Sequence, residues 1–200
     1  MDTSRVDAEF SELLAQITGQ KLRQQDLNPL GIFMPALISV LLGVIVINRA
    51  VAIEEKQHLQ KVLNLFIAPD SELRPFVQRL LQGIYQQQVY LQPNELHLLV
   101  SPLSISERLL LICFGYDMAG VTGTMGVSKE MYLRSLSHRF AIDPRYTAVL
   151  AASFSHQEIV DKYTFKQVYT LLKSADLQKL DAAFMKATET ILSTLATSLK

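Results

Sequence analysis

Hydrophobic residues recur along most of this chain at intervals of three and four, a spacing that places side chains on one face of an α-helix. One such stripe runs from Val6 to Ile17 and predicts an opening helix from Ser4 to Thr18, ended by Gly19. Sustained two-residue alternation, which is typical of β-strands, is missing from the sequence. The pattern therefore predicts an all-α protein.

Further helices are expected where the same spacing is bounded by breakers or capping residues. Their expected ranges are from Pro29 or Phe33 to Arg49, 54–67, from Asp70 or Ser71 to Gln88, 94–100, from Ser104 through Phe114, 130–140, 145–154, and two runs in the tail through Phe165–Leu172 and Leu177–Leu195. Ser104 and Glu107 match a capping box, in which each side chain bonds the other's backbone amide. The four glycines of Gly115–Gly126 predict a loop or a broken helix end, because glycine costs about 1 kcal/mol in a helix interior.

The segment Leu27–Asn48 has no charged residue. A membrane-spanning helix needs about 20 apolar residues, so this segment could be a span or a helix buried among other helices. Pro29 and Pro35 interrupt its first third, and the remaining chain offers several one-sided helices that need a partner. We therefore expect a buried central helix, and keep membrane association through residues 27–48 as an alternative.

A faint duplication links two parts of the chain. Ile53, Leu59, Val62 and Phe66 are echoed 74 residues later by Val127, Leu133, Leu136 and Phe140. A proline–aspartate breaker follows each phenylalanine, in Phe66-Ile-Ala-Pro-Asp70 and in Phe140-Ala-Ile-Asp-Pro144. The echo predicts two related helical hairpins that bury their apolar stripes against each other. Coincidence between two amphipathic helices is the alternative, because 49% of the residues are hydrophobic.

Composition narrows the classes of function. Nineteen basic and nineteen acidic residues give a formal net charge of zero, which removes the electrostatic basis for general nucleic-acid binding. Cys113 is the single cysteine and lies in an apolar run, so we expect a buried thiol with a raised pKa and no disulfide within the chain. The amino terminus lacks the layout of a secretion signal. Together these features predict a cytoplasmic protein.

Catalytic motifs are missing from the sequence. The glycine-rich segment lacks the Gly-Lys-Ser/Thr ending of a P-loop, and no Gly-x-Ser-x-Gly elbow occurs. The four histidines, which are His58, His97, His138 and His156, have no zinc-ligand spacing and are expected to be solvated or capping residues. We therefore expect a protein that is not an enzyme and holds no cofactor.

The segments before the two echoed helices carry a family resemblance. They read Ala50-Val-Ala-Ile53-Glu-Glu-Lys56 and Thr124-Met-Gly-Val127-Ser-Lys-Glu130. This layout resembles the TerB-like domains, named after a tellurite-resistance protein, over about residues 30 to 155. The resemblance implies an all-helical bundle with pseudo-twofold repetition and an association with stress response. In that family each turn carries Asp-Gly-x-Ile-Ser-x-x-Glu, but here Ala50-Val51 and Thr124-Met125 replace the aspartate and glycine.

The acidic residues that remain at these turns are Glu54, Glu55 and Glu130. They are the candidate metal ligands, although a tight divalent-cation site needs several oxygen ligands with carboxylates that converge. Acids in the first turn of a helix also interact favourably with its positive end, by about 0.3–1 kcal/mol each. We favour this structural role, and a weak divalent-metal sensor is the alternative function.

The sequence thus predicts an amino-terminal helix in residues 1–28, a TerB-like bundle of two pseudo-repeated hairpins in 29–155, and a helical extension or linker in 156–200. We expect a non-catalytic interaction or adaptor module whose partner is a protein, an adjacent domain of a longer chain, or a membrane surface to which it is peripheral. The last helical stripe has near-heptad spacing and could pair with a second copy of the chain, although docking on its own bundle is favoured.

Overall fold

A computed structural model describes residues 8–21, 27–48, 51–68, 70–123, 125–155, 157–159 and 161–197, and within these ranges the chain forms helices and no strand. The helices are α1 (Ala8–Thr18), α2 (Pro29–Val46), α3 (Ile53–Phe66), α4 (Arg74–Gln87), the 3₁₀ turn η3 (Val89–Leu91), α5 (Pro93–Val100), α6 (Ile105–Gly120), α7 (Val127–Arg139), α8 (Pro144–Phe154), α9 (Lys162–Leu172), α10 (Ala175–Gln178) and α11 (Ala182–Thr197). The prediction of an all-α bundle is confirmed for this part of the chain.

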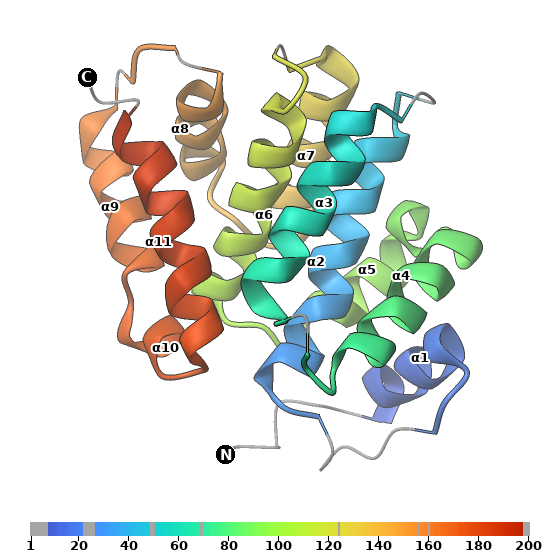
Figure 1. Ribbon diagram of the computed structural model, residues 1–200. Helices are drawn as coiled ribbons and strands as arrows, with labels where there is room; N and C mark the ends of the chain where they lie inside the picture. The colour runs from blue at the N-terminus through green and yellow to red at the C-terminus, as the bar shows by residue number, and fades with distance from the viewer. Residues whose placement is uncertain are drawn as a thin grey trace.

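Helices α2 and α6 lie side by side at the centre of the molecule, and the other helices are arranged around them (Figure 1). On one flank α4 and α5 cover α2, and α1 packs on α4 and α5. On the other flank α8, α9 and α11 cover α6. Helices α3 and α7 each contact both central helices. The hydrophobic side chains of all these elements form one continuous core.

Helix α2 is the apolar segment expected at the centre. Asn28 caps it, because its Oδ1 accepts a hydrogen bond from the Gly31 amide at 2.8 Å, and Pro29 occupies the first turn. Among the described residues, α2 is the one helix long and apolar enough to span a membrane, with a mean hydropathy of 2.4. Other helices of the chain bury 89% of it, so the buried-helix interpretation agrees with the structure.

Several predicted boundaries are confirmed by their capping contacts. Gly19 adopts a left-handed φ of 68° at the end of α1. The Ser104 amide donates to Glu107 Oε2 at 2.8 Å, and Ser104 Oγ accepts from the Glu107 amide at 3.3 Å, which completes the predicted capping box. At the start of α8, Asp143 Oδ1 accepts from the Arg145 amide at 2.9 Å.

Three predictions of helix extent were wrong. The expected tail helix through Leu177–Leu195 is divided, because α10 ends at Gln178 and α11 begins at Ala182. Helix α6 continues through Gly115 to Gly120, because Gly115 makes room for a neighbour: a Cβ there would lie 2.5 Å from Leu133 Cδ2 of α7. Helix α4 begins at Arg74, later than expected, because Ser71 Oγ accepts from the Leu73 amide at 3.3 Å within the preceding turn.

The carboxy-terminal helix packs on its own bundle. Its apolar stripe of Phe184, Ala187, Ile191 and Leu195 is fully buried. The Phe184 ring lies 4.9 Å from the Phe33 ring and 5.6 Å from the Phe66 ring, so the tail shares the core of α2 and α3. The docking interpretation is therefore confirmed, and while α11 stays docked its stripe is not available to a second copy of the chain.

Candidate functional site

An ion pair joins the starts of α3 and α7. Lys129 Nζ donates to Glu55 Oε1 at 2.6 Å, and each side chain is only 3% exposed. The second oxygen, Glu55 Oε2, accepts from the Ala52 amide at 2.9 Å, which caps α3. Removing one member would leave a buried charge unpaired, which typically costs about 3–5 kcal/mol. The pair therefore fixes the two helix starts beside each other.

The turns that precede the two helices also approach each other. A Cβ on Gly126, the residue before α7, would lie 3.7 Å from Nδ2 of Asn48, which follows α2. Ala50 and Thr124 lie outside the described residues. Both helix starts are at the upper end of the molecule in Figure 1.

Large apolar side chains are exposed at this same end. The first residues of α3 and α7, Ile53 and Val127, are 69% and 72% exposed. Val51, two residues before Ile53, and Met131, four residues after Val127, are exposed as well. We call Val51, Ile53, Val127 and Met131 the apolar end patch. Single exposed apolar residues are common on soluble proteins, whereas several gathered at one end are typical of interaction sites.

Two further contacts hold α3 and α7 on the central helices. His58 Nε2 of α3 lies 2.6 Å from Asp117 Oδ2 of α6, with both side chains about four-fifths buried (18% and 22% exposed). On α7, the Tyr132 hydroxyl donates to the Tyr90 carbonyl at 3.0 Å and lies where a Cβ on Gly43 of α2 would otherwise be. Burial, and to a smaller extent the nearby Tyr90, raises the pKa of Tyr132 above its usual value.

The three predicted metal ligands are placed differently from one another. Glu54 is exposed in the first turn of α3, Glu55 pairs with Lys129, and Glu130 pairs with Arg134 at 2.7 Å. The structure thus places the Glu55 carboxylate against the start of α7, where it contacts the ammonium group of Lys129. In the part of the chain that the structure describes, no three His, Cys, Asp or Glu side chains converge as metal ligands. A weak metal site at these residues stays a prediction.

The sequence did not indicate the partners of Glu55 and His58. Lys129 was missed as a partner, although its separation of 74 residues from Glu55 equals the spacing of the echo. His58 was expected to be solvated or capping, but it is largely buried against Asp117. His156 lies outside the described residues. His97 and His138 are exposed and line a surface groove between α5 and α7.

Cys113 matches its expected environment. The thiol is fully buried in α6, and burial, followed by the charge of Asp117, raises its pKa well above the usual range. A thiol in this state is a poor nucleophile, because the thiolate is the reactive form.

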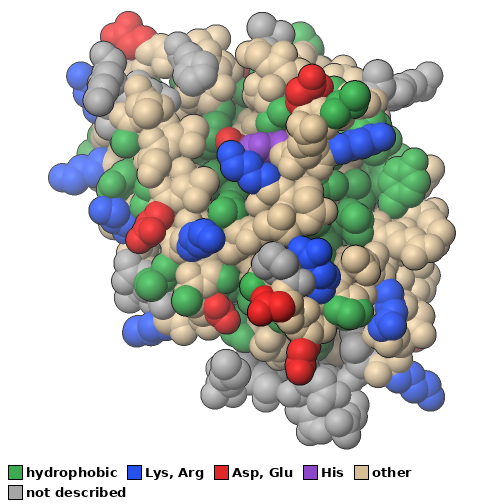
Figure 2. Space-filling view, in the orientation of Figure 1, with side chains coloured by type: hydrophobic (Ala, Val, Ile, Leu, Met, Phe, Trp, Pro, Cys, Tyr) green, Lys and Arg blue, Asp and Glu red, His purple; other side chains and the backbone are tan. Residues whose placement is uncertain are grey.

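The visible surface has no block of one charge. Figure 2 shows acidic and basic side chains interspersed over this face, as the net charge of zero suggests. A comparison of the chain with protein-family models, with curated proteins and with solved structures finds no match. The resemblance to TerB-like domains therefore depends on the two turn segments and the echo alone.

Proposed function

We propose that this protein is a non-catalytic interaction module of the TerB-like type, which binds a protein partner through the apolar end patch. The observation that carries the proposal is the matched exposure of Ile53 and Val127. These two residues occupy equivalent places in the echo, each opens a helix, and each presents a large apolar side chain to solvent.

The exposure of Ile53 and Val127 contrasts with the burial of the other residues of the echo. The other echoed side chains are all buried, namely Leu59, Val62, Phe66, Leu133, Leu136 and Phe140. In each copy, the echoed side chains therefore pack into the core, except for the first one, Ile53 or Val127. Two large apolar side chains kept in water at equivalent positions favour a role in contact with another molecule.

A pseudo-twofold relation between the two hairpins is part of the proposal, and the ion pair supports it. In a twofold arrangement, equivalent residues touch each other only near the axis. Glu55 and Lys129 are 74 residues apart, the same spacing as the echo, and each is the third residue of its helix. Their contact is the one expected of equivalent positions beside an axis.

A second pair of contacts supports the same relation. A twofold axis requires that a contact from the first copy to the second has a counterpart from the second to the first. His58 on Asp117 and Tyr132 on Gly43 are such counterparts, because each member of one contact is 74 residues from a member of the other. The residue types differ, as in a duplication whose copies have diverged.

Partner capture from the native cells tests the proposal. The variant Ile53→Ser/Val127→Ser removes apolar surface without touching the core, and Tyr85→Ser/Leu91→Ser is a matched control at exposed apolar residues elsewhere. We expect wild-type protein and the control to retain the same protein partner after crosslinking, and the patch variant to lose it. Equal recovery by all three would contradict the proposal, as would retention of lipid vesicles and no protein.

A further inference from the structure

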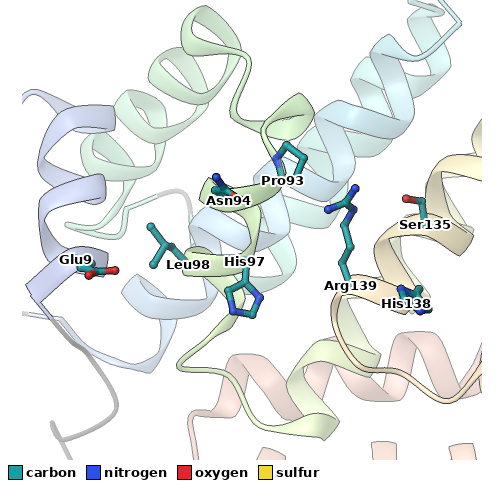
Figure 3. A pocket seen from close by; sticks show the side chains of 8 residues that line it. All are labelled: Glu9, Pro93, Asn94, His97, Leu98, Ser135, His138 and Arg139. Atoms are coloured by element: carbon teal, nitrogen blue, oxygen red, sulfur yellow. The ribbon is translucent and has the colours of Figure 1, made fainter.

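A groove lies at the opposite end of α7 from the apolar end patch. It has a volume of about 930 Å³ and is lined by α1, α5 and α7. Figure 3 shows Glu9 of α1 on one side, His138 and Arg139 of α7 on the other, and His97 and Leu98 of α5 between them. This volume is in the range of about 300–1,000 Å³ that ligand sites occupy, and it is much larger than a single phosphate needs.

The groove has a basic side made from two helices. His138 and Arg139 are consecutive in the last turn of α7, and His97 comes from the last turn of α5. In Figure 3 the Arg139 side chain extends from α7 towards Pro93 at the start of α5. Arginine presents its donors in a planar fork that matches a carboxylate, and histidine adds N–H donors beside it.

These donors have no partners within the described part of the chain. The side chains of His97, His138 and Arg139 make no hydrogen bond or ion pair there, and Glu9 on the facing wall does not reach Arg139. By contrast, the neighbouring arginines Arg134 and Arg145 are both paired with acids of their own helix or cap. Among the described residues, the basic side of the groove therefore has unpaired donors that could bind an anion.

The two walls carry opposite charges, and apolar groups lie between them. Leu98 and Pro93 line the groove together with the polar residues. An inorganic anion would use only the Arg139 side and would gain nothing from Leu98, whereas an extended peptide could use both walls and the apolar residues. The charge pattern matches a segment with an acidic residue at one end and a basic residue at the other.

We propose that this groove binds a short segment of a protein partner, with an Asp or Glu carboxylate on Arg139, which lies between His97 and His138, and a Lys or Arg near Glu9. An apolar side chain between these charges packs on Leu98. The inference rests on the proposed function as an interaction module, but it uses a surface separate from the apolar end patch.

Fluorescence anisotropy of the full chain with labelled octapeptides tests the inference. The probes are a pool with Asp or Glu near one end, Leu at the centre and Lys near the other end, and the same pool with Asn, Gln and Ser at the charged positions. We expect the charged pool to bind and the neutral pool to bind at least about tenfold more weakly, since hydrogen bonds to charged groups contribute about 1.5–3 kcal/mol. Binding should also weaken as salt is raised.

Three variants localise the binding. Arg139→Gln and His97→Gln should each reduce affinity for the charged pool, the arginine change by about tenfold. Arg79→Gln, at an exposed arginine of α4 outside the groove, should leave it unchanged. Equal binding of both pools, or no effect of Arg139→Gln, would overturn the inference. The inference would also fail if inorganic phosphate displaced the charged and the neutral peptides completely and at the same phosphate concentration.

The patch variant separates this inference from the proposed function. Ile53→Ser/Val127→Ser should keep full affinity for the charged pool, because Val127 is at the other end of α7 and Ile53 is in α3, which does not line the groove. If the groove fails these tests while the patch variant still loses its partner, the proposed function stands and the groove inference falls.

Discussion

At the residue scale, three polar contacts that are wholly or partly buried hold α3 and α7 in place. Glu55 meets Lys129, His58 meets Asp117, and the Tyr132 hydroxyl meets the Tyr90 carbonyl. Such contacts are strong in a low-dielectric interior and costly when one member is lost. They tie α3 and α7 to their neighbours through a few side chains whose removal can be measured.

Alkaline pH should destabilise the protein through Tyr132. Its pKa is raised in the folded state, so its contribution is fully present below the unfolded-state pKa of about 10 and is lost as pH rises above that value. Urea unfolding at pH 7 and at pH 10.5 should show a fall in the free energy of unfolding that is smaller in Tyr132→Phe. An identical fall in the variant would contradict the assignment.

Cys113 should be inert in the folded protein. Its thiol is fully buried and its pKa is raised, so few molecules present an accessible thiolate. A disulfide reagent such as Ellman's reagent at pH 8 should label it only after denaturant is added. Rapid stoichiometric labelling of the native protein would show that α6 opens readily.

At the element scale, glycines decide how closely helices approach. A Cβ on Gly83 of α4 would overlap the Ile17 carbonyl of α1, and backbone cannot rotate away as a side chain can. A Cβ on Gly120, at the end of α6, would meet only the Phe154 carbonyl at an ordinary 3.5 Å. The same substitution should therefore have opposite effects at the two positions.

Gly83→Ala should destabilise the protein by about 1–3 kcal/mol through overpacking. Gly120→Ala should be neutral or stabilising by up to about 1 kcal/mol, since alanine is the better helix former. Chemical denaturation of both variants gives the comparison. Equal stability of the two would mean that α1 does not dock on α4 as the structure places it.

Much of the element order followed from hydrophobic spacing and caps, but contacts between helices did not. Ser104 and Asp143 marked helix starts because a cap is a local interaction within a few residues. Gly115 was misread as a break because the sequence does not reveal whether a glycine ends a helix or admits a neighbour such as Leu133. The partner of Glu55 was hidden for the same reason, since it depends on tertiary packing.

At the scale of the whole molecule, the carboxy-terminal helix belongs to the same core as the central helices. Phe184 of α11 packs its ring against Phe33 and Phe66. Phe184→Ala should lower the global free energy of unfolding by about 3–5 kcal/mol. Met185→Ala, at the adjacent and 44% exposed position, is the matched control and should change little.

Hydrogen exchange distinguishes a shared core from a tail that folds separately. In a shared core, Phe184→Ala should speed the exchange of the most protected amides of α2 and α3 together with those of α11. Faster exchange confined to residues 162–197 would instead describe an extension that folds apart from the bundle.

The proposed pseudo-twofold relation between the two hairpins is tested most directly by exchanging the charges of the Glu55–Lys129 ion pair. Lys129 is the third residue of α7, as Glu55 is of α3, so a glutamate at 129 could cap the Gly126 amide as Glu55 caps Ala52. Glu55→Lys and Lys129→Glu should each destabilise by about 3–5 kcal/mol in urea unfolding, because each places two like charges in the interior. The double variant Glu55→Lys/Lys129→Glu should return to within about 1–2 kcal/mol of the wild type, since equivalent environments exchange their charges. A double variant as unstable as the sum of the two single variants would contradict the equivalence.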